Sequence, residues 1–166
     1  QGEQVRINVN SIELKEFVES QIPVYGIDSA KIEFNIQPTN DAWCRDHGPA
    51  FLVKKGVSDR LVVNWEYNAW GGKYPPFSDD NALPLTIASR LQLAAVSPGI
   101  IMEGGSVDFN GAGTVLTSRS CLLNPNRNPH LTQAQIEEYL CHFYGVSQVL
   151  WVSDGIVGDD TDGHID

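Results

Sequence analysis

The sequence lacks several features that would settle its class at once. It has three cysteines, Cys44, Cys121 and Cys141, and no C-x-x-C pair. An odd count without a metal-type pair argues against a disulfide-built secreted domain and favours a reducing compartment, so we expect a cytoplasmic protein. No stretch approaches the roughly 20 apolar residues that a membrane-spanning helix needs. The first residues show no basic start followed by an apolar run, so no signal peptide is predicted.

Basic residues are also scarce. Lys and Arg number 11 against 21 Asp and Glu, which gives a formal charge of -10. Nucleic acids and anionic membranes bind basic surfaces, so neither is expected as a partner. An acidic protein can attract a cationic ligand to a cleft, but the same charge also keeps many proteins soluble. The charge therefore fits a small cationic ligand without requiring one.

The remaining composition is that of a globular protein. A chain of 166 residues with 42% hydrophobic residues can bury a core without disulfides or metals. No linker or low-complexity segment interrupts it, so we expect a single domain over residues 1–166. The chain begins with Gln rather than Met, which indicates trimming at the front.

Hydrophobic periodicity predicts a mixed α/β fold. Ser11 and Thr132 are expected helix N-caps, Pro84 a first-turn residue and Gly145 a helix end. The turns at 54–59 and 110–113 predict hairpins. Helices are expected at 11–22, 84–93 and 131–145, and strands at 5–11, 31–37, 49–55, 60–67, 94–102, 106–111, 113–122 and 147–155. Helices recur after groups of two or three strands, roughly every 50 to 60 residues, which suggests a repeated small module.

Four clusters combine glycine with polar or charged groups: "NDAWCRDHGP" (40–49), "AWGGKYPP" (69–76), "MEGGSVDF" (102–109) and the closing "GDDTDGHID" (158–166). Glu103 ends an apolar run, where a carboxylate is costly unless it is paired. On a strand, His164 and Asp166 would point the same way. Trp43 and Trp70 lie in loops, where they could face a cavity and contact a cation.

Each candidate has a structural alternative. Asp46 could pair with Arg45 or cap a turn, and Glu103 could form a turn. His164 could be a structural histidine. Two of the three acidic residues Asp159, Asp160 and Asp162 are expected to be solvated. The loop at 121–132, which contains Arg127 and Asn128, is expected to be a rigid entry to the following helix.

Two residue patterns suggest metal sites. "DDTDG" suggests a calcium loop, but an EF-hand needs an acidic ligand where Gly158 stands. His164 and Asp166 suggest iron bound by two histidines and a carboxylate. That site would need His47, His130 or His142 as its second histidine. The prediction is for no metal and no cofactor.

Taken in order, "DAWCRDHGP", "NAWGGKYPPFSDDNALP", "EGGSVDFNGAGTVLTSRSCLLNPNRNP" and "DTDGHID" resemble the agmatine deiminase and bacterial peptidylarginine deiminase family of guanidino-group-modifying enzymes. The resemblance runs from about residue 36 to the end. It implies a pentein fold, a β/α-propeller of five modules around a pseudo-fivefold axis. It also implies a hydrolase of polyamine biosynthesis that converts agmatine to N-carbamoylputrescine and ammonia through a Cys-thiouronium intermediate.

The resemblance also implies roles for single residues. Asp46 and Asp166 would hold the guanidinium nitrogens, and His164 would be the general acid and base. Glu103 would be the partner of His164, and Trp43 and Trp70 would line the substrate channel. Two opposed carboxylates suit a planar cation, and a histidine suits proton transfer near neutral pH.

The family's nucleophile is a cysteine beyond G-H-x-D, and no cysteine of this chain matches its motif. We therefore expect an incomplete catalytic domain, cut at the C-terminus, that is inactive alone. Peptidyl-arginine as substrate, and a non-catalytic module that binds guanidinium or polyamine cations, stay open as alternatives. So does assembly into a homo-oligomer.

Overall fold

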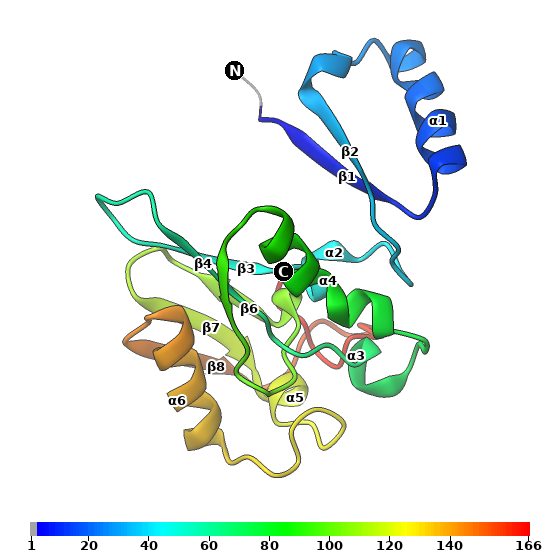
Figure 1. Cartoon of the computed structure of the whole chain (residues 1–166). Helices are drawn as coiled ribbons and strands as arrows, with labels where there is room; N and C mark the ends of the chain where they lie inside the picture. The colour runs from blue at the N-terminus through cyan, green and yellow to red at the C-terminus, as the bar shows by residue number, and fades with distance from the viewer. Residues whose placement is uncertain (1–2) are drawn as a thin grey trace. The chain divides into compact units, whose positions relative to one another are not determined.

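The computed structural model describes residues 3–166, which form two compact units (Figure 1). The first reaches to Ala42 and the second comprises Trp43–Asp166. The single domain expected over residues 1–166 stays a prediction. Each unit is described by itself below.

The first unit is a β-α-β element. Its elements are β1 (Val5–Val9), α1 (Ile12–Gln21), the 3-10 helices η1 (Ile22–Tyr25) and η2 (Ser29–Lys31), and β2 (Ile32–Ile36). β1 pairs in parallel with β2. As predicted, Ser11 is the N-cap of α1, where its hydroxyl accepts a hydrogen bond from the Leu14 amide at 3.2 Å.

The second unit contains two three-stranded sheets with one topology. The first sheet has the order β3 (Ala50–Val53), β4 (Arg60–Val63), β5 (Ala94–Val96), and the second has the order β6 (Val107–Phe109), β7 (Thr114–Ser118), β8 (Gln148–Val152). In each sheet the first two strands are antiparallel and the last two are parallel. A helix precedes each parallel third strand: α4 (Ser78–Arg90) and α6 (Gln133–Tyr144). The chain thus repeats one small module, as the spacing of the helices suggested.

Turn and cap chemistry explains most of these boundaries. The turns at 54–59 and 110–113 close the two predicted hairpins. Thr132 caps α6 in a capping box with Gln135, and Gly145 ends that helix at a φ of 68°. Such a positive φ is easily adopted by glycine, which has no Cβ. These predictions are confirmed.

The helix predicted at 84–93 begins earlier than expected. α4 starts at Ser78, and Pro84 lies inside it rather than in its first turn. Its first turn contains Asp79 and Asp80, whose negative charge favours a helix N-terminus. Gly, Pro, Asn and Asp are frequent before Pro84, a composition typical of a loop, which hides the helix start in the sequence.

Four short helical turns of the second unit were not predicted. They are α2 (Cys44–His47), α3 (Ala69–Gly72), η3 (Gly104–Ser106) and α5 (Arg119–Leu122). The run 113–122, expected as one strand, ends as β7 at Ser118, whose side chain then caps α5. Turns of four residues or fewer carry almost no periodic signal, so only their caps could have revealed them.

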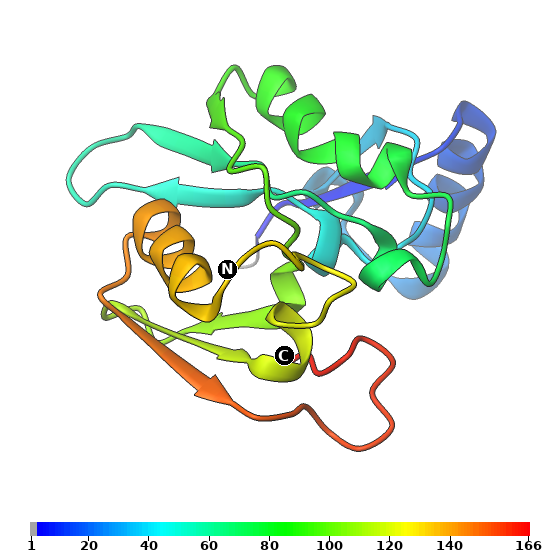
Figure 2. The same cartoon turned by 90° about the horizontal axis from the view of Figure 1, so that it is seen from below.

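The core of the second unit lies around α6, which packs beside β8 (Figure 2). Its buried side chains are Val63, Trp65, Ile100, Met102, Val107, Val115, Cys121, Leu122, Ile136, Leu140 and Val146. None of the helices in residues 3–166 combines the length and apolar character required to cross a membrane.

Leu140 tests this core because its side chain is fully buried on α6. We expect Leu140→Ala to lower the free energy of unfolding by about 2 to 5 kcal/mol, since it removes buried methyl groups and leaves a cavity. Glu138→Ala, on the exposed face of the same helix, should change it by about 0.5 kcal/mol or less. Chemical denaturation measures both, and equal effects would contradict the assigned core.

Candidate active site

The predicted site residues lie in three segments, each of which follows a parallel-paired strand in the chain: β2, β5 or β8. Asp46 lies in α2, which precedes β3, and Glu103 comes directly before η3, which precedes β6. His164 and Asp166 lie in the segment that follows β8. Figure 2 shows this segment (red) looping back beside α5, where Ser118 Oγ donates to the Gly163 carbonyl. The structure brings Asp46, His164 and Asp166 together.

Asp46 is buried and accepts two hydrogen bonds. The Trp70 indole donates to its Oδ2 at 3.1 Å, and the Gly105 amide donates to its Oδ1 at 3.1 Å. His164 Nδ1 lies 3.5 Å from Oδ1. Burial raises the pKa of Asp46, and His164, Trp70 and Gly105 offset part of that rise. A bound cation would favour the ionised carboxylate further.

Gly105 allows Asp46 and His164 to approach each other. A Cβ at this position would overlap both His164 Nδ1 and Asp46 Oδ1. The backbone of Gly105 also joins the two segments, because its amide bonds Asp46 and its carbonyl accepts from the Ile165 amide at 3.2 Å. The second glycine of E-G-G-S is therefore explained sterically, because a side chain at this position would overlap both groups.

The backbone around His164 is held by Asp159. Its carboxylate accepts hydrogen bonds from the amides of Thr161, Gly163 and His164 at 2.9, 3.1 and 2.8 Å. Gly163 adopts a φ of 107°, which glycine reaches without strain. The imidazole is buried, and its Nε2 has no hydrogen-bond partner among residues 3–166. One ring nitrogen is thus left for a ligand or a further group.

Asp166 is the more accessible carboxylate. Its Oδ1 lies 3.9 Å from His164 Nδ1, and its side chain is 38% exposed. Arg45 Nε lies 3.5 Å from its other oxygen. His164 Nδ1 is therefore near two carboxylates, one buried and one open to solvent.

Glu103 lies deeper, in an ion pair with Arg127. Arg127 Nε donates to Glu103 Oε1 at 2.7 Å, and both side chains are fully buried. Burial raises the pKa of Glu103, and the Arg127 guanidinium counters part of this rise. The predicted partnership of Glu103 with His164 stays a prediction: their nearest candidate ligand atoms lie within 4.8 Å.

Cys121 is the cysteine nearest to this cluster, but it is a poor nucleophile. Its thiol is buried, with Sγ 4.0 Å from Glu103 Oε2. Burial, and then the charge of Glu103, raise the pKa of the Cys121 thiol far above its usual value. A nucleophile would need the thiolate, which this environment disfavours.

A cluster with metal-ligating atoms within 4.8 Å of one another contains Glu103, Cys121 and His164. It has a single histidine, so in the described part of the chain the two-histidine iron arrangement is not formed there. His47 lies instead 3.8 Å from Asp80 of α4. The Arg127 charge at Glu103 also opposes a metal cation.

The two tryptophans differ. Trp70 is buried and donates to Asp46, whereas Trp43 is 61% exposed. Their lining of a substrate channel stays a prediction. Trp70 has a left-handed φ of 54° inside α3, where Asn68 caps the turn, so a strained turn aims the indole at Asp46.

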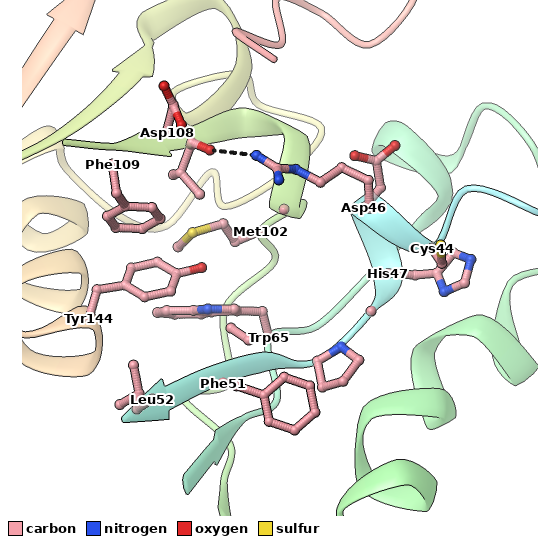
Figure 3. A pocket seen from close by; sticks show the side chains of 16 residues that line it. Cys44, Asp46, His47, Phe51, Leu52, Trp65, Met102, Asp108, Phe109 and Tyr144 are labelled. Carbon is pink, nitrogen blue, oxygen red and sulfur yellow. Dashed lines mark hydrogen bonds between the residues drawn. The ribbon is translucent and has the colours of Figure 1, made fainter. Parts of the chain in front are cut away.

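A cavity of about 480 Å³ borders Asp46 (Figure 3). Aromatic and apolar side chains line most of it, with the labelled Phe51, Trp65, Met102, Phe109 and Tyr144 turned toward it. Arg45 is among the lining residues and donates to the Val107 carbonyl at 3.4 Å. His164 and Glu103 are not among the lining residues, so this hollow adjoins the polar cluster rather than containing it.

Sequence reasoning missed several residues that build the site. Arg127 was assigned to a rigid loop, and two of the three acids near the end were assigned to solvent. In the structure Asp159 holds the His164 backbone, Asp162 bonds Arg127 and Lys73, and Asp160 accepts from the Tyr74 hydroxyl. Arg127 lies in a stretch rich in Asn and Pro, and its acidic partners are 24 and 35 residues away, so the sequence gives no local signal for these pairs.

Comparison with known proteins identifies the family of this chain. The Porphyromonas-type peptidyl-arginine deiminase family matches residues 1–166, and the chain belongs to that family. A Pseudomonas savastanoi agmatine deiminase is 42% identical over 145 residues, covering 84% of this chain and 39% of its own. A Yersinia pestis protein, provisionally named an agmatine deiminase, is 46% identical over 132 residues, 77% of this chain and 36% of its own.

Solved structures give the same picture. An agmatine deiminase of Enterococcus faecalis superposes with a TM-score of 0.86 at 33% identity, covering 97% of this chain and 43% of that one. A C. jejuni agmatine deiminase variant with substrate bound gives 0.82 at 35% identity, covering 98% and 46%. The chain thus spans well under half the length of these relatives.

Gly105 tests the contact at the centre of the site. We expect Gly105→Ala to push His164 Nδ1 and Asp46 Oδ1 further apart than 3.5 Å, because the added methyl group overlaps both atoms. A crystal structure of the variant measures this distance. Gly111→Ala, where a Cβ meets nothing within 4 Å, should leave it unchanged. An unaltered distance in Gly105→Ala would contradict the assigned packing.

Asp162 gives a pH prediction. Burial alone would raise its pKa, but hydrogen bonds from Lys73, Asn126 and Arg127 outweigh this and lower the pKa to about 2, against an ordinary 3.8. A lowered pKa stabilises the folded state when the group is ionised. The stabilisation should be complete above about pH 5 and be lost as the pH falls toward about 2.

The measurement is the free energy of unfolding of Asp162→Asn and wild type across this range. The variant should be less stable at neutral pH, and the difference should shrink below about pH 4. Asp154→Asn, which changes an exposed acid, is the control. A difference that does not depend on pH would show that Asp162 has no lowered pKa.

Proposed function

We propose that this chain is part of an enzyme that hydrolyses a guanidinium group, with agmatine as substrate and N-carbamoylputrescine and ammonia as products. The observation that supports this most is the placement of His164 Nδ1 between Asp46 and Asp166, at 3.5 and 3.9 Å. A guanidinium is planar and presents five N–H donors, which two carboxylates and an adjacent proton carrier suit. The names of the relatives favour the same chemistry.

In the proposed reaction a cysteine thiolate attacks the guanidinium carbon and forms a C–S bond. One C–N bond then breaks, and the departing nitrogen takes a proton from His164 and leaves as ammonia. Asp46 and Asp166 hold the remaining nitrogens and their positive charge. The product of this half is a thiouronium linked to the enzyme.

Water completes the proposed reaction. His164 removes a proton from a water molecule, which attacks the same carbon, and the C–S bond breaks to return the thiolate. The ureido group is released, and the second proton of that water passes to solvent. Glu103, held by Arg127, would keep His164 oriented. The nucleophilic cysteine would lie outside these 166 residues. The thiol of Cys121 is buried and its pKa is raised, and neither Cys44 nor Cys141 lies in the nucleophile motif that the family resemblance implies.

The proposal extends to the architecture. Two sheets of identical topology and one β-α-β element would be consecutive modules of a five-module β/α-propeller, the pentein fold. All three cysteines are unpaired, which suits a cytoplasmic enzyme of polyamine biosynthesis. No cofactor is required by this chemistry, and small cationic substrates are the proposed partners.

Peptidyl-arginine is the second candidate substrate, because the matching family carries that name. Its reacting group is the same guanidinium, so the residues described here would serve either substrate. The two differ in what is attached to that group. A non-catalytic guanidinium or polyamine module would use the same carboxylates without a nucleophile.

The test uses the natural full-length chain that contains these residues. We expect it to release ammonia from agmatine, and Asp46→Asn and Asp166→Asn to lower kcat/KM by at least about 100-fold, because each removes a charged hydrogen bond to the cation. Asp108→Asn, which changes an exposed acid beside the cavity, should retain activity.

The same assay separates the alternatives. Ammonia release from an arginine peptide and not from agmatine would replace the substrate. Calorimetry that shows agmatine binding without turnover would indicate the non-catalytic module. Neither binding nor turnover with either compound would contradict a guanidinium site.

A further inference from the structure

Arg127 lies between two parts of the site that the sequence separates. It belongs to the loop after α5, which was expected only to stiffen the entry to α6. Its guanidinium is fully buried. A buried charge is retained only where its partners are well placed, so each of its contacts has a structural reason.

One edge of the guanidinium holds Glu103. Nε donates to Glu103 Oε1 at 2.7 Å, and this carboxylate is fully buried as well. Glu103 is thereby kept as an ion pair next to the Cys121 thiol and close to His164. Loss of Arg127 would leave that carboxylate without its countercharge.

The other edge holds the segment that carries His164. Nη1 donates to Asp162 Oδ2 at 2.8 Å, and Nη2 donates to the Thr161 carbonyl at 3.1 Å. Thr161 is itself hydrogen-bonded to His164, whose amide donates to the Thr161 hydroxyl at 3.0 Å. The contacts thus run from Glu103 through one planar cation to the backbone of His164.

We propose that Arg127 is a positioning residue that fixes the distance between Glu103 and His164 by bonding Glu103 with one edge and the 159–162 segment with the other. The inference rests on the proposed function for its effect on turnover. A guanidinium is suited to this task because its donors have a fixed fork geometry, whereas a lysine ammonium is a point charge.

The groups that face Arg127 give the proposal a pH signature. Glu103 precedes η3, Cys121 lies on α5 and Asp162 lies on the final segment. Burial raises the pKa of Glu103 and the Arg127 charge offsets part of that rise, so removal of Arg127 should raise this pKa further. The acid limb of the kcat/KM profile should then move to higher pH.

The experiment compares Arg127→Met and Arg127→Lys in the natural full-length chain with agmatine. We expect Arg127→Met to lower kcat by about 100-fold, since a misplacement of about 1 Å has that effect. KM should change less, because Trp70 and Gly105 rather than Arg127 hold Asp46. Arg127→Lys should lose less activity, because it keeps the charge and loses one edge. Arg119→Met is the matched control. Arg119 is an exposed arginine of α5 that lies over the Trp151 ring.

Hydrogen exchange gives a readout that does not need turnover. The amides of residues 159–165 should exchange at least about tenfold faster in Arg127→Met, because their anchor is removed, and should be unchanged in Arg119→Met. A wild-type chain without turnover would contradict the proposed function, and this exchange would still decide the role of Arg127. If Arg127→Met fails to fold, Arg127→Lys decides it. Wild-type kcat, an unmoved acid limb and wild-type exchange in the substituted protein would overturn the proposal.

Discussion

The buried ion pair between Glu103 and Arg127 is the interaction on which the rest of the site depends. A carboxylate that far from water is costly, and the guanidinium at 2.7 Å offsets part of this cost. The same guanidinium bonds the segment that brings His164 back toward Asp46. Gly105, which packs against both side chains, then allows His164 Nδ1 to lie 3.5 Å from Asp46 Oδ1. The polar cluster is therefore a network in which each member is held by at least one buried neighbour.

The repeated module explains why these residues meet. Asp46 follows β2 in the chain, Glu103 follows β5, and His164 follows β8. Both β5 and β8 are the parallel third strand of their sheet. Side chains beyond the carboxyl ends of parallel strands commonly form ligand sites. Three equivalent positions of a repeated unit thus supply an acid, a second acid and a histidine, although the sequences around them differ.

The sequence predicted the parts of this fold that follow local rules. Ser11, Thr132 and Gly145 are caps with a short-range mechanism, and the two hairpin turns contain glycine. The motifs named Asp46, Glu103, His164 and Asp166 through a family resemblance. The role of Arg127 and the identity of the groups that pack against Gly105 could not be predicted in this way, because these neighbours are distant in sequence. Pro84 is typical of a first helical turn, so the sequence predicted a helix that starts there. In the structure α4 starts at Ser78, more than one turn before Pro84.

The most direct test is a crystal structure of the natural full-length chain with agmatine bound and its nucleophile made inert. The account predicts that the guanidinium nitrogens lie within hydrogen-bond distance of both Asp46 and Asp166, with the His164 ring facing the central carbon. A ligand that contacts neither carboxylate, or that occupies only the aromatic cavity beside Asp46, would contradict it.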